Sequence, residues 1–146
     1  MLSNSATIRE RTQAQGSMKR LLAFWCFAVL IGHCQSALAQ ISQKVVDIPT
    51  CLGVTQRFLY LAPESPIAAV ILFAGGHGGL QILPNGSFKW GEQNFLVRTR
   101  QLFAKNGLSV AVVDAPSDRQ AAPFLGGFRQ RPEHIADIKA VIAWLK

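Results

Sequence analysis

The sequence predicts an α/β fold in which antiparallel edge strands precede a parallel strand–helix–strand–helix segment. Runs of apolar residues at 68–74 (AAVILFA) and 108–113 (LSVAVV) are typical of strands buried in a sheet. Each run is followed by a segment with apolar residues at helical spacing, 92–106 and 132–145. Because two parallel strands need a crossover connection, usually a helix, this order predicts that the two buried strands lie parallel.

Two further strands are expected before this segment. Residues 45–48 are a short strand-like run that Pro49 ends. Residues 54–61 (VTQRFLYL) alternate polar and apolar at first and are rich in β-forming residues. The two prolines in 62–66 (APESP) predict a turn. The first two strands are therefore expected to lie beside the parallel pair, antiparallel to each other.

Two helices complete the expected fold. The helix at 92–106 is expected to stop at Asn106-Gly107, because glycine adopts the left-handed conformation that ends helices. The last helix is expected to begin near Pro132, since a first helical turn tolerates proline. His134 in that turn is expected to face the solvent. The apolar face of this helix is expected to contain Ile135, Ile138, Val141, Ile142 and Leu145.

The first 39 residues have the pattern of an export signal. Lys19 and Arg20 precede an apolar run at 21–31, and Ala37-Leu38-Ala39 follows as a cleavage sequence of small residues. We therefore expect an upstream polar extension at 1–17, a signal peptide at 18–39, and a periplasmic or secreted product cleaved between Ala39 and Gln40. The alternative is an uncleaved anchor, for which the apolar run is short.

Composition excludes several classes of function. The formal net charge is +7, but residues 1–39 hold four cations and one anion, which leaves +4 for residues 40–146. These cations are scattered and form no basic stripe, so no nucleic-acid partner is expected. His77 and His134 lie far apart without companion ligands, so neither a metal nor another cofactor is expected. Cys51 is the single cysteine after the signal.

The most informative segment is the glycine cluster at 75–79 (GGHGG), directly after the first buried run. A dinucleotide fingerprint would start at Gly76 and Gly78, but its sixth position is Gln81 and no helix follows at once. A phosphate-binding P-loop fails because no Gly-Lys-Ser/Thr follows. Two interpretations remain open. The glycines let backbone N–H groups approach a substrate oxygen, or they let a buried strand turn sharply.

Three segments, AVILFAGGHGG at 69–79, LSVAVVDAPSD at 108–118 and RPEHIADIKAVIAWLK at 131–146, resemble the α/β-hydrolase superfamily. The likeness is to the N-terminal half of a secreted bacterial serine hydrolase and covers roughly residues 54–146. It implies hydrolysis of a small ester-like substrate. It also implies that Gly78 and Gly79 are oxyanion-hole donors, with His77 as the histidine that leads their loop.

Two other residues are candidates for a substrate crevice. Gly76 lies in the glycine loop, and Asp114 follows the second buried run, where open α/β sheets bind ligands. The alternative for Asp114 is that it caps its own loop, with Ser117 and Asp118, through side-chain-to-backbone hydrogen bonds.

The catalytic triad of such an enzyme is absent from the sequence. No serine stands in a G-x-S-x-G elbow, so no member of the Ser-Asp-His triad can be assigned. We therefore expect residues 40–146 to be a partial domain that stops before the nucleophile elbow. The alternative is a non-catalytic small α/β protein that binds a ligand or partner at the Gly75–Gly79 loop.

Overall fold

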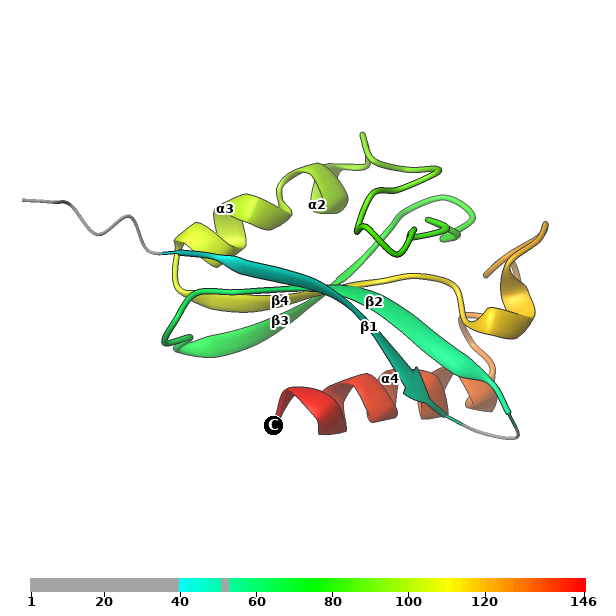
Figure 1. Cartoon of the computed structure of the whole chain (residues 1–146). Helices are drawn as coiled ribbons and strands as arrows, with labels where there is room; N and C mark the ends of the chain where they lie inside the picture. Colours follow the sequence, from blue (N-terminus) through cyan, green and yellow to red (C-terminus); the bar gives the residue numbers. More distant parts are fainter. Residues whose placement is uncertain (1–39, 51–52) are drawn as a thin grey trace, which may run out of the picture. The chain divides into compact units, whose positions relative to one another are not determined.

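The computed structural model describes residues 40–50 and 53–146. The expected upstream extension, the signal peptide and Cys51 lie outside these residues. The described part contains a four-stranded mixed sheet with the strand order β1-β2-β4-β3 (Figure 1). Its strands are β1 (Ser42–Pro49), β2 (Thr55–Ala62), β3 (Ala68–Phe73) and β4 (Leu108–Val113).

The pairing of the strands confirms the predicted α/β class. Strands β1 and β2 pair antiparallel, and so do β2 and β4. Strands β3 and β4 pair parallel, with Val70 opposite Val110. The two apolar runs therefore form the parallel pair, and β4 is the strand that joins it to the antiparallel part.

The crossover between β3 and β4 differs from the single helix expected at 92–106. It contains two short helices, α2 (Phe95–Arg98) and α3 (Arg100–Lys105), which meet at Thr99. The hydroxyl of Thr99 donates a hydrogen bond of 2.7 Å to the carbonyl of Phe95. Threonine hydroxyls that bind the preceding turn of backbone are unfavourable inside helices, which accounts for a break at this residue.

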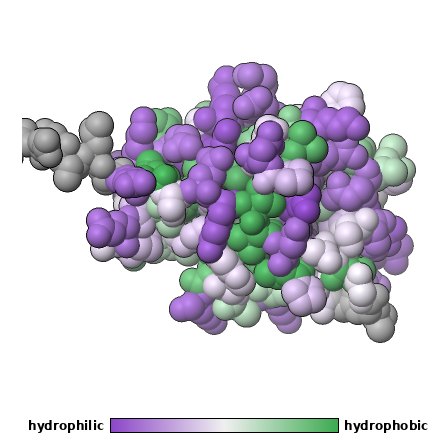
Figure 2. Space-filling model, viewed as in Figure 1, coloured by the Kyte–Doolittle hydropathy of each residue, from purple (hydrophilic) through white to green (hydrophobic). Residues whose placement is uncertain are grey.

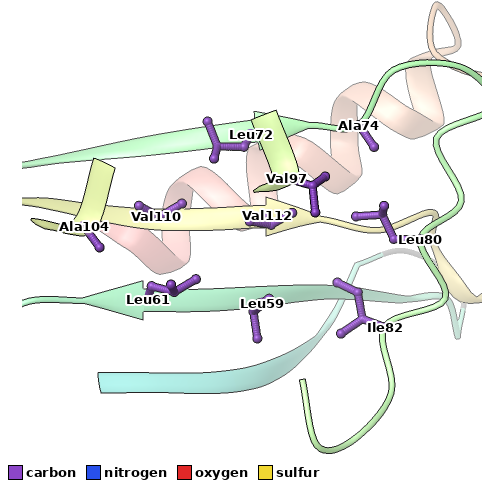
Figure 3. Packing of buried hydrophobic residues seen from close by; sticks show 10 residues of the cluster. All are labelled: Leu59, Leu61, Leu72, Ala74, Leu80, Ile82, Val97, Ala104, Val110 and Val112. Carbon is purple, nitrogen blue, oxygen red and sulfur yellow. The ribbon is translucent and has the colours of Figure 1, made fainter. Parts of the chain in front are cut away.

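The sheet is covered by helices on both faces (Figure 1). Helices α2 and α3 lie on one face, and α4 (Pro132–Leu145) lies on the other. Val97 of α2 points toward the middle of the sheet, while Leu80 and Ile82 close the end of the core beyond the strands (Figure 3). The buried cluster on this face consists of Leu59, Leu61, Leu72, Ala74, Leu80, Ile82, Val97, Ala104, Val110 and Val112.

Strand β3 is less buried than expected. Strand β4 is buried almost throughout, as predicted, but β3 exposes Ala68, Ala69 and Phe73, the last by 40%. Among the described residues, β4 is the only strand that pairs with β3, so β3 forms an edge of the sheet. An apolar composition therefore did not distinguish an edge strand from a central one.

The inward face of α4 agrees with the expected one in part: Val141 is buried, and Ile138 and Leu145 pack against the same cluster. Ile135 is 50% exposed and Ile142 is exposed too, whereas His134 and Asp137 are buried with Val141. The first turn of α4 packs against the loop that precedes it, and the rings of His134 and Phe128 have centroids 5.6 Å apart. The expectation that His134 faces the solvent is wrong for this reason.

The surface in the view of Figure 2 is mostly hydrophilic, with a band of hydrophobic atoms near its middle. Within residues 40–50 and 53–146, no helix has the length and the apolar character that crossing a bilayer requires.

Candidate functional site

The glycine loop lies at the carboxyl end of β3, directly after Ala74. Asp114 follows β4, and because β3 and β4 are parallel, both segments leave the sheet at the same edge. Open α/β sheets bind ligands outside the carboxyl ends of their parallel strands. This edge is therefore the place in the fold where a site is expected.

Asp114 fixes the backbone that follows the glycine loop. Its side chain is almost fully buried. Oδ1 accepts hydrogen bonds from the N–H groups of Leu80 (2.7 Å), Gln81 (3.1 Å) and Ala115 (2.7 Å), and Oδ2 accepts one from Ile82 (2.8 Å). The carboxylate thus serves as a common acceptor for four backbone donors and ties the end of β4 to the segment after β3.

Asp114 also lines a cleft of about 390 Å³. At its rim Arg57 donates two hydrogen bonds of 2.7 Å to the carboxylate of Asp47. The hydrogen bond with Arg57 lowers the pKa of Asp47, against a smaller raising effect of burial. The other residues that line this cleft are Thr55, Ile82, Ala115, Ser117 and Gln120.

Gly78 and Gly79 are buried and lie against another segment of the protein. A Cβ atom on Gly78 would lie 2.5 Å from Nη2 of Arg129 and 2.7 Å from Cδ1 of Leu125. A Cβ atom on Gly79 would overlap the ring of Phe124. In this structure the two glycines therefore allow the segment 124–129 to pack directly on their backbone.

His77 joins the glycine loop to the same segment. Its ring stacks on Phe124 with centroids 4.5 Å apart, and its carbonyl accepts a hydrogen bond of 2.9 Å from the N–H of Leu125. Its Nδ1 accepts a hydrogen bond of 3.1 Å from the N–H of Gly79. The guanidinium of Arg129 adds a hydrogen bond of 2.8 Å to the carbonyl of Ala74.

The first half of the loop is open. Gly75, Gly76 and His77 are exposed, and a Cβ atom on Gly76 would have no atom within 4 Å. Gly76 has φ of +66°, a left-handed conformation that glycine adopts without the cost other residues incur. Here glycine is required by the turn itself, whereas at Gly79 it is required by the packing.

Two residues with left-handed backbone were missed by sequence reasoning. Gln81 has φ of +47° and Phe124 has φ of +53°. The side chain of Gln81 accepts a hydrogen bond of 3.0 Å from the indole of Trp90 and donates one of 2.8 Å to the carbonyl of Gln120. Such conformations persist only where the surroundings hold them. Neither residue type signals this conformation in a sequence.

A second and larger cleft, of about 620 Å³, lies between the loop after β4 and the start of α4. Phe124, Phe128 and the buried Asp137 line it, together with Val54, Asp118, Arg119, Ala121, Ala122, Pro123, Gly126, Gly127, Arg131 and Glu133. In the part of the chain that the structure describes, no group of three histidine, cysteine or acidic side chains is placed to hold a metal ion.

His134 is a titratable group buried beside this cleft. Burial lowers the pKa of His134 from its ordinary value of 6.5; Asp137 opposes that shift and Arg129 adds to it. A histidine with a lowered pKa takes up its proton at higher pH in the unfolded chain than in the folded one. Acid therefore favours unfolding, and stability is lost as the pH falls below about 6.5 toward the folded pKa.

Replacing His134 by glutamine is expected to weaken the dependence of stability on pH below about 6.5. The melting temperature of the wild type should fall more steeply than that of His134→Gln between about pH 7 and pH 5. Thermal unfolding followed by circular dichroism at several pH values measures this. Lys139→Gln, an exposed change on the same helix, is the control and should keep the wild-type slope. Equal slopes for His134→Gln and wild type would contradict this effect of burial.

Comparison of the chain with protein-family models, with curated proteins and with solved structures gave no significant match.

Proposed function

We propose that this chain supplies the oxyanion loop of an exported α/β-hydrolase-type protein that cleaves ester-like or related acyl substrates with a serine nucleophile. One observation carries the proposal. The glycine loop directly follows a parallel strand, and the carboxylate of Asp114 holds the adjoining backbone through the N–H groups of Leu80, Gln81 and Ile82. Donors that stabilise a developing oxyanion are effective when their positions are fixed before the reaction.

The geometry supports Gly79 as the donor. Its N–H group points at Nδ1 of His77 at 3.1 Å, which marks a position that a hydrogen-bond acceptor occupies. A substrate oxygen in the place of this ring nitrogen would accept a hydrogen bond from the same N–H group. His77 is exposed, and a substrate that took the place of its ring would have to displace the ring from its stacking contact with Phe124. Under this proposal His77 is a positioning residue for the loop.

Under this proposal the nucleophile is not among the 146 residues. No serine of the sequence stands in a G-x-S-x-G elbow. The proposal therefore assigns the serine and its histidine and acid partners to a part of the protein that follows Lys146. The two crevice candidates differ in what they can offer a substrate. Gly76 lies on the open side of the loop, whereas both oxygens of Asp114 already accept hydrogen bonds from backbone N–H groups.

A non-catalytic protein that binds a ligand or partner at the glycine loop is the second candidate. The observation that favours it is the open first half of the loop, where Gly75, Gly76 and His77 are exposed and a Cβ atom on Gly76 would have no atom within 4 Å. A binding loop does not need a nucleophile, so this candidate requires nothing beyond the residues described.

The test is to express both the 146-residue chain and the complete product of its gene, and to treat each with a fluorophosphonate probe and a chromogenic short-chain ester. We expect a covalent label on one serine of a G-x-S-x-G motif in the complete product, and none in the 146-residue chain. Turnover should disappear when that serine becomes alanine. A complete product that neither labels nor hydrolyses esters would contradict the hydrolase proposal and favour the binding protein.

A further inference from the structure

The cleft of about 620 Å³ between the loop after β4 and the start of α4 has the features of a separate ligand site. No residue of the Gly75–Gly79 loop lines it, so it is distinct from the proposed oxyanion position. Its walls include two aromatic rings, Phe124 and Phe128, and small side chains such as Ala121 and Ala122. Charged side chains line it as well, namely Asp118, Arg119, Arg131, Glu133 and Asp137. Small-molecule sites are typically clefts of this size in which a few polar groups fix the orientation of the ligand.

Among the charged residues that line this cleft, Asp137 is the buried one. The residue is only 1% exposed, and its Oδ1 atom is buried without a hydrogen-bond partner among the described residues. A buried carboxylate oxygen without a donor is costly, because the hydration lost on burial is not replaced. Such a group in a native structure calls for an explanation.

His134, one helical turn before Asp137, does not supply the missing donor. Its Nδ1 atom is also buried without a partner among the described residues, so the two side chains do not satisfy each other through these atoms. The carboxylate of Asp137 therefore remains a hydrogen-bond acceptor without a donor among the described residues. A bound ligand could supply that donor.

The charges at the rim of the cleft offset one another. Asp118 and Arg119 form an ion pair of 3.5 Å, and the guanidinium of Arg119 lies over the ring of Phe128 at 4.6 Å. Arg131 and Glu133, both exposed, add one charge of each sign. Among the charged residues that line the cleft, the carboxylate of Asp137 is the charge left over. Arg129 lies near His134, but it does not line the cleft and donates to the carbonyl of Ala74. The cleft therefore favours a ligand that brings a positive charge and hydrogen-bond donors.

We propose that this cleft binds a small organic ammonium ion, with its charged nitrogen donating to Asp137 and its apolar body lying between the cleft walls that include Phe124 and Phe128. An ammonium group satisfies both needs of the carboxylate, since it carries three donors and a compensating charge. A neutral hydroxyl would supply only a donor, and an anion would be repelled.

The proposal is tested by titrating the full chain with benzylamine, using calorimetry or NMR near neutral pH. We expect a Kd of about 1 mM or tighter. Benzyl alcohol and benzoate have the same ring with a neutral or negative group and should bind at least about 10-fold more weakly, as expected for loss of a charge-assisted hydrogen bond. Equal binding of benzylamine and benzyl alcohol, or no binding of benzylamine at about 10 mM, would overturn the proposal.

Variants locate the site. Asp137→Asn keeps the shape of the side chain and should weaken benzylamine about 10- to 100-fold, whereas Glu64→Gln, which changes an exposed carboxylate that does not line the cleft, should alter the Kd by less than about threefold. If circular dichroism shows that Asp137→Asn does not fold, Ala121→Trp takes its place, because it narrows the cleft and leaves the carboxylate intact. Unchanged binding in the folded variant used would place the ligand elsewhere and refute the assignment.

Discussion

Replacing Asp114 by alanine is expected to remove a large part of the stability of the fold. The change leaves four backbone N–H groups without their acceptor, and three of them belong to Leu80, Gln81 and Ile82 in a distant segment of the chain. Each donor left unsatisfied in a buried place costs about 1–3 kcal/mol. A total loss of about 4 kcal/mol or more is therefore expected, against about 5–15 kcal/mol for a typical native protein.

Urea unfolding followed by circular dichroism measures this loss as a change in midpoint at constant slope. Asp114→Asn is an informative partner variant. Its remaining oxygen can still serve the three N–H groups that Oδ1 serves, but its amide group meets the N–H of Ile82, so about half the loss is expected. Asp118→Ala, an exposed carboxylate four residues on, should change the free energy of unfolding by less than about 0.5 kcal/mol. A loss below about 1 kcal/mol for Asp114→Ala would contradict the stabilising role of this carboxylate.

The sheet was predictable from the sequence because its cues are local. The apolar runs at 68–74 and 108–113 and the segments between them suffice to predict a parallel pair, and the prolines at 62–66 indicate where the preceding strand ends. The edge position of β3 was not predictable, because it depends on which strands pair with it. The break at Thr99 depends on a single hydroxyl, which residue periodicity does not represent.

In the candidate site, too, the features set by local sequence were predictable, whereas those set by contacts between distant segments were not. The sequence predicts a tight glycine loop after β3 and a carboxylate after β4, and both lie at one edge of the sheet. What each side chain contacts depends on segments far apart in the chain. Asp114 was expected to cap its own loop or line a crevice; it does line a cleft, but three of its four hydrogen bonds reach back more than thirty residues. The burial of His134 and Asp137 follows from the packing of α4 against the preceding loop, which the helical spacing of the apolar residues does not indicate.

The glycines of the loop are expected to respond differently to substitution. Gly79→Ala should destabilise the fold by about 1–3 kcal/mol, the usual cost of forcing extra atoms into a packed place. The backbone of Gly79 is not left-handed, so alanine adds no conformational strain, and the clash with the ring of Phe124 is the whole cause. Gly76→Ala is the matched control. The new methyl group has open space around it. The free energy of unfolding should therefore fall by about 1–2 kcal/mol, because alanine is strained in the left-handed backbone conformation of this position.

A double-mutant cycle with Phe124→Ala separates the two causes. Once the ring is removed, Gly79→Ala should cost less than about 0.5 kcal/mol, whereas the cost of Gly76→Ala should stay as it was. That result would establish that Gly79 is glycine because Phe124 packs on it, whatever further role its N–H group has toward a substrate. If Gly79→Ala costs the same with and without the ring, or costs nothing in the wild-type background, the packing of Phe124 is not the reason. The approach of a ligand to the backbone would then remain as the explanation for the second half of the loop.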